Sequence, residues 1–171
     1  MNVVLVGARG SGKTTIGKRL ADRLWQTYID IDELIVRKAG KNIKEIFEED
    51  GEAHFREIET ACLRECLQVP DTVIGLGGGT VTIEVNRTLL KESGAKVIYL
   101  KCEPEELHKR IEADPQSPIT RPPLTHLGGG IEEVKLLLER REPYYRDVMT
   151  SELDVTNLTP EEAVVYISRM L

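Results

Sequence analysis

Short runs rich in β-branched residues alternate along the chain with longer stretches whose apolar positions recur at helical spacing. This alternation predicts an α/β fold in which parallel strands are joined by crossover helices. The predicted strands are residues 2–6, 27–31, 72–76, 96–102 and 152–156. The predicted helices are residues 12–24, 33–39, 43–67 with a break at Gly51, 82–93, 104–113, 131–149 and 160–171.

One segment interrupts this rhythm. Residues 113–130, "ADPQSPITRPPLTHLGGG", contain four prolines and three glycines between two predicted helices. A loop of this length inside a compact domain is usually functional or disordered. A linker between domains is the alternative, but only about 40 residues follow it, too few for a second core. We therefore predict a single domain over residues 1–171, with a mobile flap at about 112–127.

Composition narrows the class of protein. The chain has 171 residues, 40% of them hydrophobic and 30% charged, as in a soluble domain. No apolar run approaches the roughly 18 residues that cross a bilayer, and residues 3–6 are too short for a signal-peptide core. We expect a cytoplasmic monomer with no membrane partner. The net charge of −6 disfavours nucleic acid, so any anionic ligand must be held by a few local cations.

The three cysteines, Cys62, Cys66 and Cys102, are an odd number in a chain with no export signal. A disulfide framework is therefore not expected. Cys62 and Cys66 could share a helix face as a metal pair, but no second pair or nearby histidine completes four ligands. We predict buried free thiols.

The clearest motif is "GARGSGKT" at residues 7–14, which matches G-x-x-x-x-G-K-[ST] at every fixed position. Glycines allow backbone N–H groups to surround phosphate oxygens, and the following helix directs its positive dipole end at them. Lys13 would reach the β- and γ-phosphates, and Thr14 would place its hydroxyl on Mg²⁺. "GLGGGT" at residues 75–80 is not a dinucleotide fingerprint, because Thr80 stands where the last glycine is required.

A second group of residues indicates the phosphoryl acceptor. Asp30 and Asp32 alternate at the end of the second predicted strand, which would direct one toward a metal and the other toward a hydroxylated substrate. The alternative is a pair of turn aspartates that cap the next helix. Arg56 and Glu59 are three residues apart on a helix, a spacing that steadies the guanidinium but is also common in surface ion pairs.

Arg141 falls within an apolar stripe at helical spacing. The stripe consists of Val134, Leu137, Leu138, Tyr145 and Val148. A guanidinium there is costly without an anionic partner, which could be a ligand or a buried carboxylate of the protein. Arg140, one step around the helix, is expected to be solvated. Guanidinium forks suit a carboxylate, so the acceptor should carry hydroxyls and a negative group.

Five elements, in order, resemble the shikimate kinase family, small relatives of the nucleoside monophosphate kinases. They are "GARGSGKTT" at the P-loop, "DID" at 30–32, "FREIE" at 55–59, "GGG" at 77–79, and "RPPL" at 121–124 followed by "RREPYY" at 140–145. The resemblance covers nearly the whole chain. It implies a three-layer P-loop kinase fold, with a five-stranded parallel sheet in the order 2-3-1-4-5, and transfer of the ATP γ-phosphoryl group to the 3-hydroxyl of shikimate.

The resemblance also implies a role for each matching residue. Thr14 and Asp30 would be the Mg²⁺ residues, Asp30 through water. Asp32 would hold ring hydroxyls and help to deprotonate the nucleophile. The implied groups for the shikimate carboxylate and its surroundings are Arg56, Arg141, Gly77, Gly78 and Gly79. The implied ATP site is Gly10, Ser11, Gly12, Lys13, Thr14, Thr15 and Arg121, with Arg121 closing from the flap and Lys13, Asp32 and Arg121 serving catalysis.

Two other functions remain open at this stage. A kinase for another hydroxy acid, such as gluconate, would also have a P-loop and a flap, but that family lacks "FREIE" combined with the triple glycine. A nucleotide-sensing module such as a small GTPase would carry N-K-x-D for guanine recognition, and this chain has none. The stretch 155–159, where such kinases contact adenine, matches no strong pattern.

Overall fold

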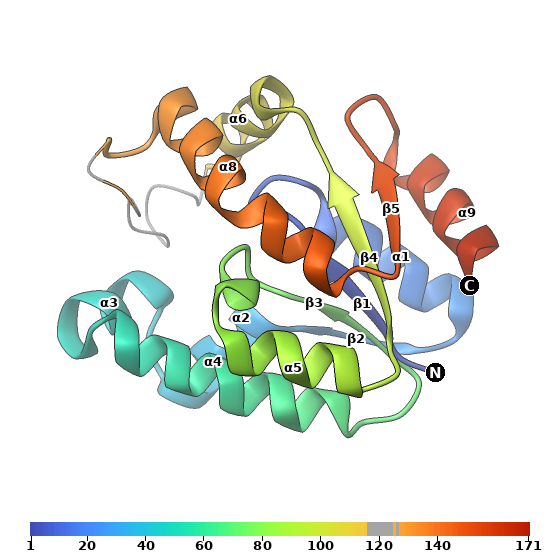
Figure 1. Ribbon diagram of the computed structural model, residues 1–171, viewed down its shortest axis with the longest axis horizontal. Coiled ribbons are helices and arrows are strands. Elements are labelled where there is room, and N and C mark those ends of the chain that lie inside the picture. Colours follow the sequence, from blue (N-terminus) through green and yellow to red (C-terminus); the bar gives the residue numbers. More distant parts are fainter. Residues whose placement is uncertain (116–124, 126) are drawn as a thin grey trace.

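A computed structural model describes residues 1–115, 125 and 127–171. Its strands form one parallel sheet in the order β2-β3-β1-β4-β5 (Figure 1). The strands are β1 (Val3–Val6), β2 (Thr27–Asp30), β3 (Thr72–Gly75), β4 (Lys96–Lys101) and β5 (Ser151–Asp154). The order implied by the family resemblance is therefore confirmed.

Helices connect successive strands, as crossover connections between parallel strands require. Among the described residues they are α1 (Lys13–Leu24), α2 (Ile31–Ala39), α3 (Ile43–Asp50), α4 (Glu52–Leu67), α5 (Glu84–Glu92), α6 (Pro104–Ala113), α8 (Gly130–Val148) and α9 (Pro160–Met170), with a 3₁₀ turn η1 (Thr80–Thr82). The predicted break at Gly51 is confirmed, because that residue separates α3 from α4 with a positive φ of 86°.

The sheet separates two apolar clusters, since neighbouring residues of a strand face opposite sides. Val4 and Val6 of β1 face α2, α3, α4 and α5, whereas Val3 and Leu5 face α1, α6 and α9. Helix α8 contributes to both clusters. Val134 and Leu138 belong to the second, and Tyr145 and Val148 to the first. Figure 1 shows this helix running from beside α6 to the middle of the molecule, where it lies near α5.

Some predicted boundaries differ from those of the structure. The helix predicted over residues 82–93 is α5, which begins at Glu84 because Ile83 is extended (φ −90°, ψ 122°) after η1. The second strand ends at Asp30 rather than at residue 31, because the Asp30 side chain accepts a hydrogen bond from Glu33 N and begins α2 there. Asp32 therefore lies in the first turn of a helix, not on a strand.

Cys62, Cys66 and Cys102 are buried free thiols, as predicted. Within the described residues, no helix has the length and apolar character needed to cross a membrane. The flap predicted at 112–127 lies largely outside the described residues, since positions 116–124 and 126 do not belong to them.

The segments that follow β1, β2 and β3 lie at the carboxyl edge of the parallel sheet. Ligands of open α/β sheets bind at this edge.

Candidate active site

The P-loop connects the buried strand β1 to the first turn of α1. Gly10 and Gly12 have φ values of 87° and 95°, in the left-handed region that side chains disfavour. The conformations of these two glycines allow the loop to turn between β1 and α1, so that α1 begins at Lys13, at the carboxyl edge of the sheet. The first backbone N–H groups of a helix have no partner within it and attract phosphate oxygens.

Lys13 extends over this loop. Its Nζ donates hydrogen bonds to Gly7 O at 2.7 Å and to Ala8 O at 3.0 Å. Lys13 also lines a cavity with Gly10, Gly12, Thr14 and Thr15, so its ammonium lies beside the space where phosphates would fit. Ser11, a residue of the same loop, is fully buried.

The same cavity extends toward β5 and α9, where Val155, Leu158 and Pro160 line it. Arg110 of α6 connects the two parts. It donates to Val155 O at 3.1 Å and to Gly10 O and Ser11 O at 3.4 Å each. Sequence reasoning missed Arg110, because Glu106 lies four residues earlier and the pair has the spacing of an ordinary helical ion pair. We refer to this space as the nucleotide cavity.

Two oxygen groups that suit a divalent cation lie together in the nucleotide cavity. Thr14 Oγ1 donates to Asp30 Oδ2 at 3.1 Å. The described residues contain no group of three or more His, Cys, Asp or Glu that could hold a metal. Mg²⁺ does not require such a group, because it keeps several waters and usually takes one or two protein oxygens together with substrate phosphates. The pair of Thr14 and Asp30 fits that donor set.

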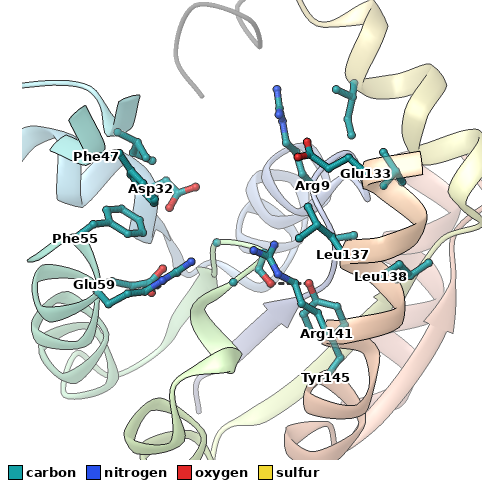
Figure 2. A pocket seen from close by; sticks show the side chains of 18 residues that line it. Arg9, Asp32, Phe47, Phe55, Glu59, Glu133, Leu137, Leu138, Arg141 and Tyr145 are labelled. Carbon is teal, nitrogen blue, oxygen red and sulfur yellow. Dashed lines mark hydrogen bonds and ion pairs between the residues drawn. The ribbon is translucent and has the colours of Figure 1, made fainter. Parts of the chain in front are cut away.

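A second cavity adjoins the first, and we call it the acid cavity (Figure 2). Its walls come from the P-loop, α2, α3, α4, α6, the loop after β3, and α8. Arg9, Asp32, Gly77 and Gly78 line both cavities, so the two spaces meet at these residues.

Arg56 of α4 and Arg141 of α8 converge in the acid cavity. A Cβ added to Gly79 would lie 2.6 Å from Arg56 Nη2 and 3.0 Å from Arg141 Nη2. Both guanidinium groups therefore approach the same glycine from opposite walls, as Figure 2 shows for the Arg141 side. Any side chain at Gly79 would occupy the space that they share.

Arg56 is held in place by a buried carboxylate. Its Nη1 donates to Glu59 Oε1 at 2.8 Å, and Thr80 Oγ1 donates to Glu59 Oε2 at 2.8 Å. Glu59 is 1% exposed, so its pairing with Arg56 is not the surface ion pair that the spacing also allowed. Burial raises the pKa of Glu59 above its ordinary value, although the nearby Arg56 guanidinium opposes this effect.

Arg141 lies where α8 passes from one apolar cluster to the other. It makes no ion pair with a carboxylate of residues 1–115, 125 or 127–171, so the alternative of a buried internal salt bridge does not hold in that part of the chain. Its neighbour Tyr145 is fully buried and donates to Gly78 O at 2.6 Å. Burial raises the pKa of Tyr145 to about 12, while the Arg141 charge acts in the opposite direction.

Asp32 reaches the junction of the two cavities from the first turn of α2. A Cβ added to Gly77 would lie 2.9 Å from Asp32 Oδ1. The predicted reason for this placement was wrong, because Asp30 caps α2 and Asp32 is helical rather than alternating on a strand. The capping alternative therefore holds for Asp30, while Asp30 lines the nucleotide cavity and Asp32 lines both cavities.

Several residues of the acid cavity were not predicted. Phe47 and Phe55 form an apolar wall with ring centroids 4.9 Å apart. Glu133 of α8 is buried and accepts hydrogen bonds from Thr125 N at 2.7 Å and Thr125 Oγ1 at 2.8 Å. Arg9 occupies a variable position of the P-loop motif, which specifies glycines, Lys13 and Thr14 and is silent about the rest. The predicted role of Arg121 concerns a residue outside the described part of the chain.

Comparison with known proteins agrees with this geometry. The family model described as "Shikimate kinase" matches residues 9–171. A shikimate kinase from Enterococcus faecalis is 41% identical over 170 residues, which cover 99% of this chain and 98% of that enzyme. The structure of shikimate kinase from Acinetobacter baumannii in complex with shikimate has a TM-score of 0.89 at 32% identity, and the match covers 99% of this chain and 91% of that one.

A more distant structure resembles this one in fold alone. A gluconokinase from Sinorhizobium meliloti has a TM-score of 0.61 at 19% identity, with 99% of this chain and 92% of that chain covered. The family model matches residues 9–171, which include every residue that lines the two cavities except Ala8. Together with the close relative in Enterococcus faecalis, it shows that this chain belongs to the shikimate kinase family.

Proposed function

We propose that this protein transfers the γ-phosphoryl group of ATP to the 3-hydroxyl of shikimate, giving shikimate 3-phosphate and ADP. The convergence of Arg56 and Arg141 at Gly79, in a cavity that meets the P-loop cavity, is the observation that carries this proposal. It supplies two forks for one carboxylate in the cavity that adjoins the phosphate site.

Substrate binding follows from the walls of the acid cavity. The shikimate carboxylate takes the place between Arg56 and Arg141, and its carbon ring lies against the apolar wall of Phe47 and Phe55. Glu59 fixes the Arg56 guanidinium before the ligand arrives, so less side-chain freedom is lost on binding. The ring hydroxyls then point toward Asp32 at the junction of the cavities.

Phosphoryl transfer takes place at that junction. The 3-hydroxyl oxygen forms a bond to the γ-phosphorus as the bond from that phosphorus to the β–γ bridging oxygen breaks, and ADP leaves. The hydroxyl proton passes to the Asp32 carboxylate. Such a reaction needs mainly positioning and stabilisation of charge. Lys13 supplies a positive charge at the phosphates, and we assign the same role to Arg121.

Thr14 and Asp30 are proposed to hold Mg²⁺, with Asp30 acting through water. When bound, Mg²⁺ neutralises the charge on the β- and γ-phosphate oxygens. The remaining ATP contacts are assigned to Gly10, Ser11, Gly12 and Thr15 of the P-loop, and the neighbouring Val155, Leu158 and Pro160 offer an apolar surface for the base.

The direct test is ADP release with Mg·ATP and each of three additions: shikimate, gluconate, or no acceptor. We expect turnover with shikimate alone. Turnover with gluconate at a comparable rate would assign the protein to the alternative hydroxy-acid kinase, and ATP hydrolysis unchanged by both acceptors would indicate a nucleotide-sensing module.

The role of Arg141 is tested by Arg141→Lys, which retains the charge and loses the fork. We expect KM for shikimate to rise about tenfold, because a charge-assisted bond is worth about 1.5–3 kcal/mol and 1.4 kcal/mol is a factor of ten. Arg140→Lys is the matched control, since that exposed side chain is the next residue of the same helix. Equal KM values for the two variants would reject the assignment.

A further inference from the structure

Tyr28 of β2 occupies a space that exists because two other residues lack side chains. A Cβ on Gly17 of α1 would overlap the Tyr28 ring, and a Cβ on Gly75 of β3 would overlap its hydroxyl. Glycine inside a helix costs about 1 kcal/mol relative to alanine. Gly17 lies in the interior of α1, where glycine lowers the stability of the helix. Alanine at this position would exclude the Tyr28 ring.

The hydroxyl group of Tyr28 contacts the Asp30 carboxylate. Tyr28 Oη donates to Asp30 Oδ2 at 3.2 Å, the same oxygen that accepts from Thr14 Oγ1 at 3.1 Å. The other oxygen, Oδ1, accepts from Glu33 N at 3.1 Å. Both oxygens of the Asp30 carboxylate therefore accept hydrogen bonds, and the three donors come from α1, β2 and α2.

The positions of Thr14, Tyr28 and Asp30 on α1 and β2 explain why their side chains come together. Tyr28 and Asp30 are two residues apart on β2 and so lie on the same face of the sheet. Thr14 and Gly17 are three residues apart on α1 and share the helix face that packs on that side. The missing side chain at Gly17 admits the tyrosine ring, and Thr14, one turn earlier, meets the carboxylate.

We propose that Tyr28 is a positioning residue for the divalent cation, because its hydroxyl holds the Asp30 carboxylate in the orientation that faces Thr14. This inference rests on the proposed metal role of Thr14 and Asp30. The terminal torsion of an aspartate is intrinsically broad, so an unrestrained carboxylate would rotate. The Thr14 hydroxyl has two lone pairs and one proton, so it can ligate a cation while still donating to Asp30.

The test is Tyr28→Phe, which keeps the ring between Gly17 and Gly75 and removes only the donor. Binding of Mn²⁺ to the protein·ADP complex is measured by electron paramagnetic resonance, and the Mg²⁺ dependence of turnover is measured separately. We expect about tenfold weaker binding of both cations, the lower end of the loss typical for residues that orient a metal ligand. The dissociation constant for shikimate without nucleotide, measured by calorimetry, should remain unchanged.

Gly75→Ala provides a second route to the same prediction, because the added methyl group would overlap the Tyr28 hydroxyl, which can move away from Asp30 only together with the ring that carries it. It should weaken Mn²⁺ binding in the same direction. Tyr166→Phe is the matched control, since Tyr166 lies on α9 and is 46% exposed, and it should bind Mn²⁺ like the original protein.

Asp30→Asn separates this inference from the proposed function. Weaker Mn²⁺ binding in Asp30→Asn, combined with unchanged binding in both Tyr28→Phe and Gly75→Ala, would overturn the positioning role and leave the metal site intact. Unchanged Mn²⁺ binding in Asp30→Asn would reject the metal role of Asp30 itself, and the inference about Tyr28 with it.

Discussion

The two cavities at the carboxyl edge of the sheet are suited to anions in different ways. The phosphate end of the nucleotide cavity is lined by one continuous segment, the P-loop and the start of α1, which supplies the N-terminus of a helix and Lys13. The acid cavity takes Arg56 from α4, Arg141 from α8 and Arg9 from the P-loop, and no single segment of the sequence builds it.

This difference has an energetic counterpart. A helix N-terminus presents its donors without burying a net charge, whereas Arg56 needs a buried carboxylate to hold it. Burial of the Glu59 charge is costly, and its pKa is raised for that reason. Under the proposed function, recognition by side chains would give the acid cavity a selectivity for a planar carboxylate, at a cost in stability that the P-loop avoids.

The largest predicted effect lies in the nucleotide cavity. Lys13→Met should lower kcat about 100- to 1,000-fold, the loss typical when one donor to a developing negative charge is removed. The shikimate dissociation constant, measured by calorimetry without nucleotide, should change less than about twofold. Lys18→Met is the control, because Lys18 is an exposed residue of the same helix. A kcat for Lys13→Met equal to that of the control would show that the ammonium has no part in the reaction.

A comparable test of the acid cavity is Gly79→Ala. The added methyl group would lie 2.6 Å from Arg56 Nη2 and 3.0 Å from Arg141 Nη2, so both flexible side chains must move away from their shared site. Loss of one charge-assisted hydrogen bond, about 1.5–3 kcal/mol, predicts a 10- to 100-fold higher KM for shikimate. KM for ATP should not change. A rise in both constants would mean that the two cavities are not independent.

The same contrast explains what the sequence could predict. The P-loop was identified from adjacent residues, because its function needs particular residue types at fixed spacing. The sheet followed from the alternation of short β-branched runs with helical stretches, and Arg141 was notable as a charge within an apolar stripe. In each case the physical cause acts within one element.

The residues that were missed or misplaced depend on contacts between elements. Arg110 resembles any helical partner of Glu106, and only the packing of α6 shows that it reaches the P-loop. The helical position of Asp32 follows from capping of α2 by Asp30, and both aspartates fit the strand pattern equally well. Glu59 was assigned a possible surface role because spacing on a helix carries no information about burial.

The cost of the acid cavity predicts a pH dependence of stability. Because the native pKa of Glu59 lies above its ordinary value of 4.5, the unfolded state loses this proton first as the pH rises. The contribution of Glu59 is therefore complete below pH 4.5 and declines as the pH rises through the native pKa. Glu59→Gln removes the titration, so the free energy of unfolding of the variant, measured by urea titration, should rise relative to that of the original protein as the pH rises from 4.5 to neutrality.

Glu48→Gln, at an exposed position of α3, serves as the control. Its difference from the original protein should stay constant over the same pH range. If the Glu59→Gln difference is equally constant, the Glu59 proton is not linked to folding, and the carboxylate is accommodated without an electrostatic cost.

The smallest predicted effect concerns the support beneath Gly78. Tyr145→Phe removes the hydroxyl that donates to Gly78 O at 2.6 Å, and the ring keeps its stacking on Tyr99 at 5.1 Å. A net loss of about 1 kcal/mol in the free energy of unfolding is expected, because a partly buried carbonyl loses its donor. Tyr144→Phe, at the neighbouring exposed position, should cost less than about 0.5 kcal/mol in the same urea titration. Since the glycine loop after β3 lines both cavities, Tyr145→Phe should raise KM for shikimate only a few-fold, and a larger rise would mean that this hydroxyl controls the acid cavity directly.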